Sequence, residues 1–195
     1  MAVSQGRVRA YLGCSLDGFI AGPDNALDWL GADYARAGDI AAAHDYLSFD
    51  TFMGSVGCLL MGRTTYDVVA GMEAWPYGPC PVLVATHRPI DAAPPTVMPR
   101  AGALPALVAQ ARQLAQGRDV YLDGGTLVRQ GLQAGIVDEL VLTWLPLLLG
   151  AGTRLFDGLE QPHHLQFGAA AASGTGLLQV HIRPLRPSPP GAAAR

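Results

Sequence analysis

Short apolar runs alternate along this chain with longer segments in which hydrophobic residues recur every three or four positions. The apolar runs are typical of buried strands, and the three-to-four spacing is typical of amphipathic helices. The runs predict strands at residues 8–14, 58–61, 81–85, 120–122, 137–145, 165–171 and 177–182. The helical spacing predicts helices at residues 39–56, 63–70, 103–116 and 126–134.

The order of these elements predicts an α/β fold. Strands alternate with helices over most of the chain, as in a mostly parallel sheet that is covered on both faces. The last two strands flank the sequence Ser-Gly-Thr-Gly at residues 173–176, which predicts an antiparallel C-terminal hairpin. We find no internal repeat or linker, so we predict a single domain over residues 1–186. Residues 187–195 are rich in proline and alanine, and we expect a disordered tail there.

Composition excludes several classes of function. A formal net charge of −3 argues against a nucleic-acid partner, which would call for a concentrated basic face. All 13 basic residues are arginines, so a P-loop lysine and a lysine Schiff base are excluded. The histidines lack the spacing of metal ligands, and we expect no metal site. The most apolar stretch, residues 140–149, is too short to span a membrane. No signal peptide precedes Arg7, so we expect a cytoplasmic protein.

A glycine pair separates one predicted strand from the helix that follows it. The sequence there reads Asp123-Gly124-Gly125-Thr126-Leu127. The first turn of a helix leaves backbone N–H groups unpaired, and the aligned peptide dipoles favour an anion beside them. Glycine lacks the side chain that would hold a ligand away from this backbone. The motif is a candidate phosphate site, and it also suits a plain chain reversal.

Two further junctions share this chemistry. Met61-Gly-Arg-Thr-Thr65 places a glycine, an arginine and two threonines where a helix begins. The threonine hydroxyls could cap their own helix or bond a pyrophosphate, and the sequence leaves both open. Thr86-His-Arg88 follows the next strand with a hydroxyl and a guanidinium. All three junctions follow the C-terminal ends of predicted parallel strands, where open α/β sheets bind ligands. Together they favour a dinucleotide, and two arginines near its adenosine end favour NADPH over NADH.

Five segments resemble, in order, the dihydrofolate-reductase-like superfamily. The match is closest to the branch named for the reductase domain of the bifunctional riboflavin-biosynthesis enzyme. The segments are Ser15-Leu-Asp-Gly-Phe-Ile-Ala21, Leu60-Met-Gly-Arg-Thr-Thr-Tyr66, Val120-Tyr-Leu-Asp-Gly-Gly-Thr-Leu127, Val137-Asp-Glu-Leu-Val-Leu-Thr143 and Pro146-Leu-Leu-Leu-Gly-Ala-Gly-Thr-Arg-Leu-Phe156. The resemblance implies a dihydrofolate-reductase-like three-layer fold with NADPH laid across the strand ends of a central sheet.

The resemblance also implies a role for each matching residue. The phosphates would be held from one side by Gly62, Arg63, Thr64 and Thr65, and from the other side by Gly124, Gly125, Thr126 and Leu127. The adenosine 2′-phosphate would be faced by Thr86, His87 and Arg88. Backbone near Gly13 and Ile20 would receive the nicotinamide amide, with the loop at residues 15–23 closing over the reacting ring.

Hydride transfer to a C=N or C=O group requires a proton, and three carboxylates are candidates for its source. Asp123 lies beside the glycine pair, where riboflavin-type reductases carry a glutamate that faces the substrate, and it is the first candidate. Asp45 and Asp50 lie on the predicted helix at 39–56, where folate-reducing members carry their carboxylate. Each of the two falls to one side of the apolar stripe formed by Tyr46, Phe49, Met53 and Val56, so the angle around the helix does not choose between them.

These observations favour an NADPH-dependent reductase that acts on a small nitrogen heterocycle. Its nearest counterpart is the 5-amino-6-(5-phosphoribosylamino)uracil reductase of riboflavin biosynthesis. A dihydrofolate or pteridine reductase and a non-catalytic NADPH-binding module are the alternatives. We also expect a homodimer, because residues 137–145 and 144–149 are more apolar than an edge element should be in water.

Overall fold

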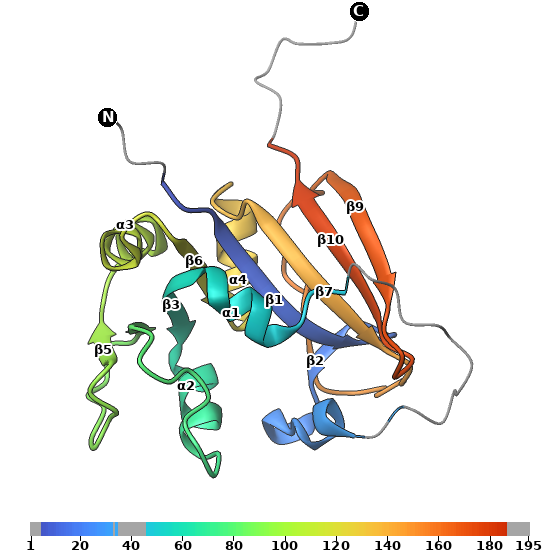
Figure 1. The fold of residues 1–195 in the computed structure, drawn as a ribbon, viewed down its shortest axis with the longest axis horizontal. Coiled ribbons are helices and arrows are strands. Elements are labelled where there is room, and N and C mark those ends of the chain that lie inside the picture. The colour runs from blue at the N-terminus through green and yellow to red at the C-terminus, as the bar shows by residue number, and fades with distance from the viewer. Residues whose placement is uncertain (1–4, 33, 35–45, 187–195) are drawn as a thin grey trace, which may run out of the picture.

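The computed structural model describes residues 5–32, 34 and 46–186. An eight-stranded sheet runs through it in the order β5-β4-β3-β6-β1-β7-β10-β9 (Figure 1). The strands are β1 (Val8–Ser15), β3 (Val56–Gly62), β4 (Val82–Ala85), β5 (Val97–Arg100), β6 (Asp119–Asp123), β7 (Glu139–Leu145), β9 (Leu165–Ala172) and β10 (Leu178–Pro184). Neighbouring strands are parallel from one edge of the sheet inward, through β5, β4, β3, β6, β1 and β7. Strand β10 is antiparallel to both of its neighbours, β7 and β9. The predicted α/β class, with its antiparallel C-terminal hairpin, is confirmed.

Helices cover both faces of this sheet and make the three layers. They are α1 (Phe49–Ser55), α2 (Arg63–Ala70), α3 (Leu104–Ala115) and α4 (Gly125–Gln133). Two 3-10 turns, η1 (Pro23–Asn25) and η2 (Asp28–Gly31), follow a small sheet in which β2 (Phe19–Ala21) pairs with β8 (Thr153–Arg154). The sequence pattern missed β2, β5 and β8, because a strand of two to four residues is too short to show a period.

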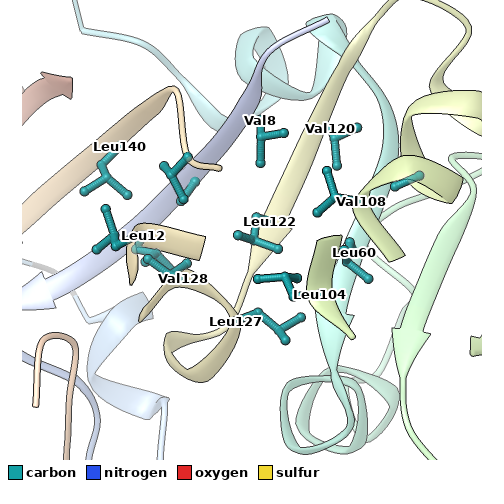
Figure 2. Close-up of a cluster of buried hydrophobic side chains, with 14 of the residues drawn as sticks. Val8, Leu12, Leu60, Leu104, Val108, Val120, Leu122, Leu127, Val128 and Leu140 are labelled. Carbon is teal, nitrogen blue, oxygen red and sulfur yellow. The ribbon is translucent and has the colours of Figure 1, made fainter. Parts of the chain in front are cut away.

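The alternation of side chains along β3 explains why this strand is apolar throughout. Leu60 joins the core cluster that includes α3 and α4, whereas Leu59 and Met61 join the cluster on the opposite face with Phe52 of α1. Figure 2 shows side chains of β1, β6 and β7 meeting those of α3 and α4 in the first of these clusters. Since both faces are buried, no polar position interrupts the strand, and its C-terminal end is held rigidly at the sheet edge.

The predicted helix at 39–56 is confirmed over residues 49–55 and wrong at residues 46–48 and at Val56, and its residues 39–45 lie outside the described part of the chain. Residues 46–48 are not helical, and α1 begins after Ser48, whose side chain accepts a hydrogen bond from the Thr51 N–H. Val56 is the first residue of β3 and pairs with Asp119. The pairing of β3 with β6 overrides the helical spacing because it buries the whole strand.

One of the two apolar stretches that suggested a dimer, residues 137–145, is corrected, whereas Leu148 of the other stretch is 68% exposed. β7 lies inside the sheet, hydrogen-bonded to β1 on one side and to β10 on the other, so its apolar residues belong to the core of one molecule. The sheet ends at β5 and at β9, and on β9 the side chain of Phe167 is 68% exposed. The candidate contact surface is therefore β9 rather than β7. The sequence pattern could not show this, because strand order is not encoded locally.

Candidate active site

A cavity of about 710 Å³ lies at the C-terminal ends of the parallel strands. The register of the sheet brings these ends together, since Met61 of β3 pairs with Asp123 of β6 and Gly62 pairs with Ala85 of β4. The loop after β1 and the N-terminal turns of α2 and α4 contribute further lining residues. The three junctions singled out in the sequence therefore meet around one space, as expected for an open α/β sheet.

Two helix N-termini open into this cavity side by side. α2 follows Gly62 and α4 follows Gly124, and neither start has a side-chain cap hydrogen bond. The hydroxyls of Thr64 and Thr65 therefore do not cap α2. A Cβ on Gly124, whose φ is +91°, would lie 2.2 Å from the Thr65 Oγ1. This close approach requires glycine at position 124. The starts of α2 and α4 therefore lie together at the cavity, and the first N–H groups of each helix have no intrahelical partner. Such paired helix starts are suited to binding a phosphate.

Two arginines near the starts of α2 and α4, Arg63 and Arg88, both interact with the carboxylate of Asp67. The Arg63 Nε donates to the Asp67 Oδ1 over 2.7 Å, and its NH1 donates to the Pro89 carbonyl over 2.9 Å. Arg88 lies 3.8 Å from the same carboxylate, with its side chain 70% exposed and outside the cavity lining. Thr86 accepts a hydrogen bond from the Arg88 N–H over 3.0 Å, which holds the turn. Arg63 is thus fixed at the cavity wall, whereas the Arg88 side chain is free to move in solvent near it.

Asp123 is a nearly buried acid on the cavity wall, 7% exposed. The Tyr77 hydroxyl donates to its Oδ2 over 3.1 Å. Burial raises the pKa of Asp123 above its ordinary value, and hydrogen bonds from Tyr77 and the Gly124 N–H oppose that rise. Next to it, the Tyr121 hydroxyl donates to the backbone carbonyl of Tyr11 over 2.8 Å. The arrangement favours a carboxyl group that keeps its proton and can donate it.

Hydrogen bonds to the Asp17 carboxylate fix the loop after β1, whose following residues line the cavity. This carboxylate accepts hydrogen bonds from the Ser15 hydroxyl over 2.6 Å and from the Leu149 and Gly150 N–H groups over 3.1 and 2.8 Å. These bonds lower the pKa of Asp17 to about 2. The anchored loop brings Ile20 against the start of α4, because a Cβ on Gly125 would lie 2.5 Å from the Ile20 Cδ1.

The structure brings most of the sequence-predicted site residues to one cavity. Its lining includes Gly13, Ile20, Gly62, Arg63, Thr64, Thr65, Thr86, His87, Asp123, Gly124, Gly125, Thr126 and Leu127. Arg88 is not among the lining residues. Asp50 is exposed in the first turn of α1 and is not brought to the cavity, and Asp45 lies outside the described residues.

Sequence reasoning missed the tyrosines Tyr11, Tyr77 and Tyr121, which line the cavity beside Asp123. Tyr77 comes from the segment between α2 and β4, 46 residues before its carboxylate partner, and no local pattern connects the two. Tyr11 and Tyr121 lie on strands, where an aromatic residue is most simply a core residue. Within the described residues no three His, Cys, Asp or Glu side chains are grouped so that they could hold a metal ion. Nor does that part of the chain contain a helix long and apolar enough to cross a membrane.

Comparison with known proteins gives a consistent result. The family model described as the RibD C-terminal domain matches residues 7–179. The uncharacterized protein YwjB of Bacillus subtilis is 27% identical over 175 residues, which cover 89% of this chain and 95% of that protein. The crystal structure of a putative riboflavin biosynthesis protein from Shewanella sp. PV-4 is 28% identical, with a TM-score of 0.76 over 92% of this chain and 99% of that one.

The fold extends to a more distant structure. Dihydrofolate reductase from Enterococcus faecalis, complexed with NADP(H), aligns with a TM-score of 0.57 at 17% identity, over 93% of this chain and 98% of that one. This likeness shows the dihydrofolate-reductase-like fold. Because the RibD C-terminal domain model matches nearly the whole described chain, the protein belongs to the RibD C-terminal domain family.

Proposed function

We propose that this protein is an NADPH-dependent reductase that transfers a hydride to a small nitrogen heterocycle. The observation that carries the proposal is the meeting, in one cavity, of two uncapped helix N-termini with a nearly buried carboxyl group. The first feature suits a pyrophosphate and the second suits proton donation to a reduced substrate. Family membership and the structural neighbours support a reductase of the riboflavin type.

The residues around the two helix starts fit the phosphate part of a dinucleotide. Gly62, Gly124 and Gly125 carry no side chain into the space, and a Cβ at Gly124 would close the gap to Thr65. Thr64, Thr65 and Thr126 would supply hydroxyl donors, and Arg63 a fixed positive charge. His87 and the exposed Arg88 would face the 2′-phosphate, and backbone near Gly13 and Ile20 the nicotinamide amide. When bound, NADPH would supply the hydride.

Asp123 would supply the proton. Its raised pKa keeps the carboxyl group protonated at a pH at which an exposed aspartate is ionised. The acid would donate this proton to the ring nitrogen or carbonyl oxygen that gains electrons. The carboxylate that remains would accept hydrogen bonds from the Tyr77 hydroxyl and the Gly124 N–H, which limits the cost of leaving a charge in a buried place. Solvent would then restore the proton.

Two measurements test this proposal. Titration of NADPH should enhance its nicotinamide fluorescence and raise the melting temperature of the protein. Absence of both at millimolar NADPH would contradict the proposal. NADPH oxidation is then followed with a panel of pterins, pyrimidines and quinones. Asp123→Asn should lower kcat by about 10²–10⁴-fold while NADPH binding is kept.

Asp50→Asn is the matched control, because it makes the same chemical change on an exposed residue outside the cavity. It should leave kcat within about twofold of the wild type, as expected of surface substitutions. A large loss with Asp50→Asn and none with Asp123→Asn would transfer the role of acid to α1. Cofactor binding without turnover of any compound in the panel would favour a non-catalytic module.

A further inference from the structure

The charged groups of the cavity lie in two places. Among the described lining residues, the formally charged side chains are Arg63 and Asp123, and His87 is the one titratable base. Arg63, the first residue of α2, follows β3, and His87 follows β4, and the cofactor phosphates are proposed to bind beside these strand ends. Arg63, the one cation among the described lining residues, therefore lies beside the proposed phosphate site.

We call the part of the cavity around Asp123 the substrate end. Its position is given by contacts: Tyr77 is hydrogen-bonded to Asp123, and Tyr121 is hydrogen-bonded to the Tyr11 backbone. Val69 belongs to the last turn of α2, about 9 Å along the helix axis from Arg63 at a rise of about 1.5 Å per residue. We assign to the substrate end the lining residues Tyr11, Val69, Tyr77 and Tyr121, which share one side-chain cluster, and Asp123, which is bonded to Tyr77. We add Met72, whose N–H donates to the Val69 carbonyl, and Leu30, which a Cβ on Gly13 would meet.

The chemistry of the substrate end is aromatic and aliphatic, with one acid. Tyr11 is half-buried and Tyr77 and Tyr121 are buried, while Leu30 and Met72 remain 38% and 47% exposed and give it an apolar rim. Burial raises the pKa of Asp123 and so favours its protonated form, which donates a hydrogen bond to a ring nitrogen or a carbonyl oxygen. Such a surface matches a planar, uncharged ring that accepts one hydrogen bond.

The substrate end is expected to bind an anionic substituent weakly. A phosphate or carboxylate placed at the substrate end would meet no cation among the described residues, and Arg63 would already be engaged by Asp67 and by the cofactor. An unpaired charge in a partly desolvated site is unfavourable, and it would also raise the cost of ionising Asp123. The phosphoribosyl group of a riboflavin precursor and the glutamate of a folate are both anions of this kind.

We infer that the substrate of this protein is an uncharged planar heterocycle without a phosphate or a glutamyl tail, packed against Tyr11 and the apolar rim of Leu30 and Met72 and hydrogen-bonded by Asp123. The inference rests on the proposed reductase function and narrows it to a substrate class. It excludes as substrates both the phosphoribosylamino-pyrimidine and the dihydrofolate that the family resemblance implies.

Matched pairs of ligands test the inference. The first pair is 5-amino-6-(5-phosphoribosylamino)uracil and its dephosphorylated form, and the second is dihydrofolate and dihydropterin. Affinities are measured by calorimetry with the full chain, both free and saturated with NADP⁺. The uncharged member of at least one pair should bind at least about tenfold more tightly than its anionic partner. Equal or tighter binding of the anionic members, or no binding of either uncharged ring, would overturn the inference.

Three variants locate the cause. Met72→Arg adds a cation to the substrate end and should raise affinity for the anionic members about threefold or more. Leu114→Arg makes the same charge change on α3 outside the cavity, with a similar starting exposure of 37%, and should leave the ratios unchanged. Arg36→Ala removes an arginine that lies outside the described residues. Loss of binding of the anionic members with this variant would overturn the inference.

NADPH fluorescence is recorded separately with the same protein samples. If NADPH fails to bind while the ligand pairs still discriminate, the proposed cofactor is at fault and the substrate class stands. If NADPH binds and the pairs do not discriminate as stated, the substrate class is wrong and the reductase proposal stands.

Discussion

Replacement of Tyr77 by phenylalanine tests whether a buried, protonated Asp123 is the acid. The substitution keeps the aromatic ring, which packs edge-on against Trp75 at a centroid distance of 5.2 Å, and removes the hydroxyl that donates to the Asp123 Oδ2. That hydrogen bond stabilises the carboxylate more than the neutral acid. Its removal should therefore raise the pKa of Asp123 further above the ordinary value.

The magnitude follows from the two states of the acid. A hydrogen bond to a charged group contributes about 1.5–3 kcal/mol, and one to a neutral group contributes about 0.5–1.5 kcal/mol. The difference, about 1–1.5 kcal/mol, corresponds to roughly one pH unit. Activity that requires a protonated Asp123 falls as pH rises through the pKa of this acid. The alkaline limb of the kcat profile should thus move upward by about one pH unit in Tyr77→Phe.

The assay is the pH dependence of NADPH oxidation between pH 5 and 10, recorded at saturating substrate. Tyr66→Phe is the control, since it removes a phenol from the same aromatic cluster without removing a hydrogen bond of Asp123. Its alkaline limb should stay in place. A limb that does not move in Tyr77→Phe, or that moves to lower pH, would refute the role of Asp123 as the acid that Tyr77 tunes.

Three further substitutions test other parts of the structure. Asp67→Asn removes the carboxylate shared by the two arginines near the cofactor site, so the ratio of kcat/KM for NADPH over NADH should rise by about three- to tenfold; an unchanged ratio would place the 2′-phosphate elsewhere. Burial alone would raise the pKa of Glu139, but the His181 hydrogen bond and the Arg9 guanidinium outweigh it and lower the pKa. The stability from Glu139 is thus present above its unfolded pKa and lost as pH falls through the folded pKa. Glu139→Gln should destabilise the protein by about 1.5–3 kcal/mol at pH 7 and flatten the acid side of its melting profile, and an acid side as steep as that of the wild type would contradict this. We propose a homodimer paired through the exposed edge strand β9, so Phe167→Glu should halve the mass measured by light scattering, whereas a monomeric wild type would refute the dimer.

The sequence determined the fold class and the glycine junctions that line one part of the cavity. Apolar runs and helical spacing are local properties, and they were sufficient to predict an α/β sheet with a C-terminal hairpin. The junctions at Gly62 and Gly124 were also visible, because glycine beside a helix start is a local signal. Their shared location followed from one general rule, that parallel strands present their C-terminal ends at the same edge.

Only the tertiary structure decided the substrate end and the outer surface. Tyr77 reaches Asp123 across 46 residues, Val56 leaves its helical pattern to pair with Asp119, and β7 lies inside the sheet while β9 forms its edge. Each outcome depends on which distant segments lie side by side. A hydrophobic period predicts that a residue is buried, but it does not identify the segment against which that residue packs. The packing of the whole chain determines that segment.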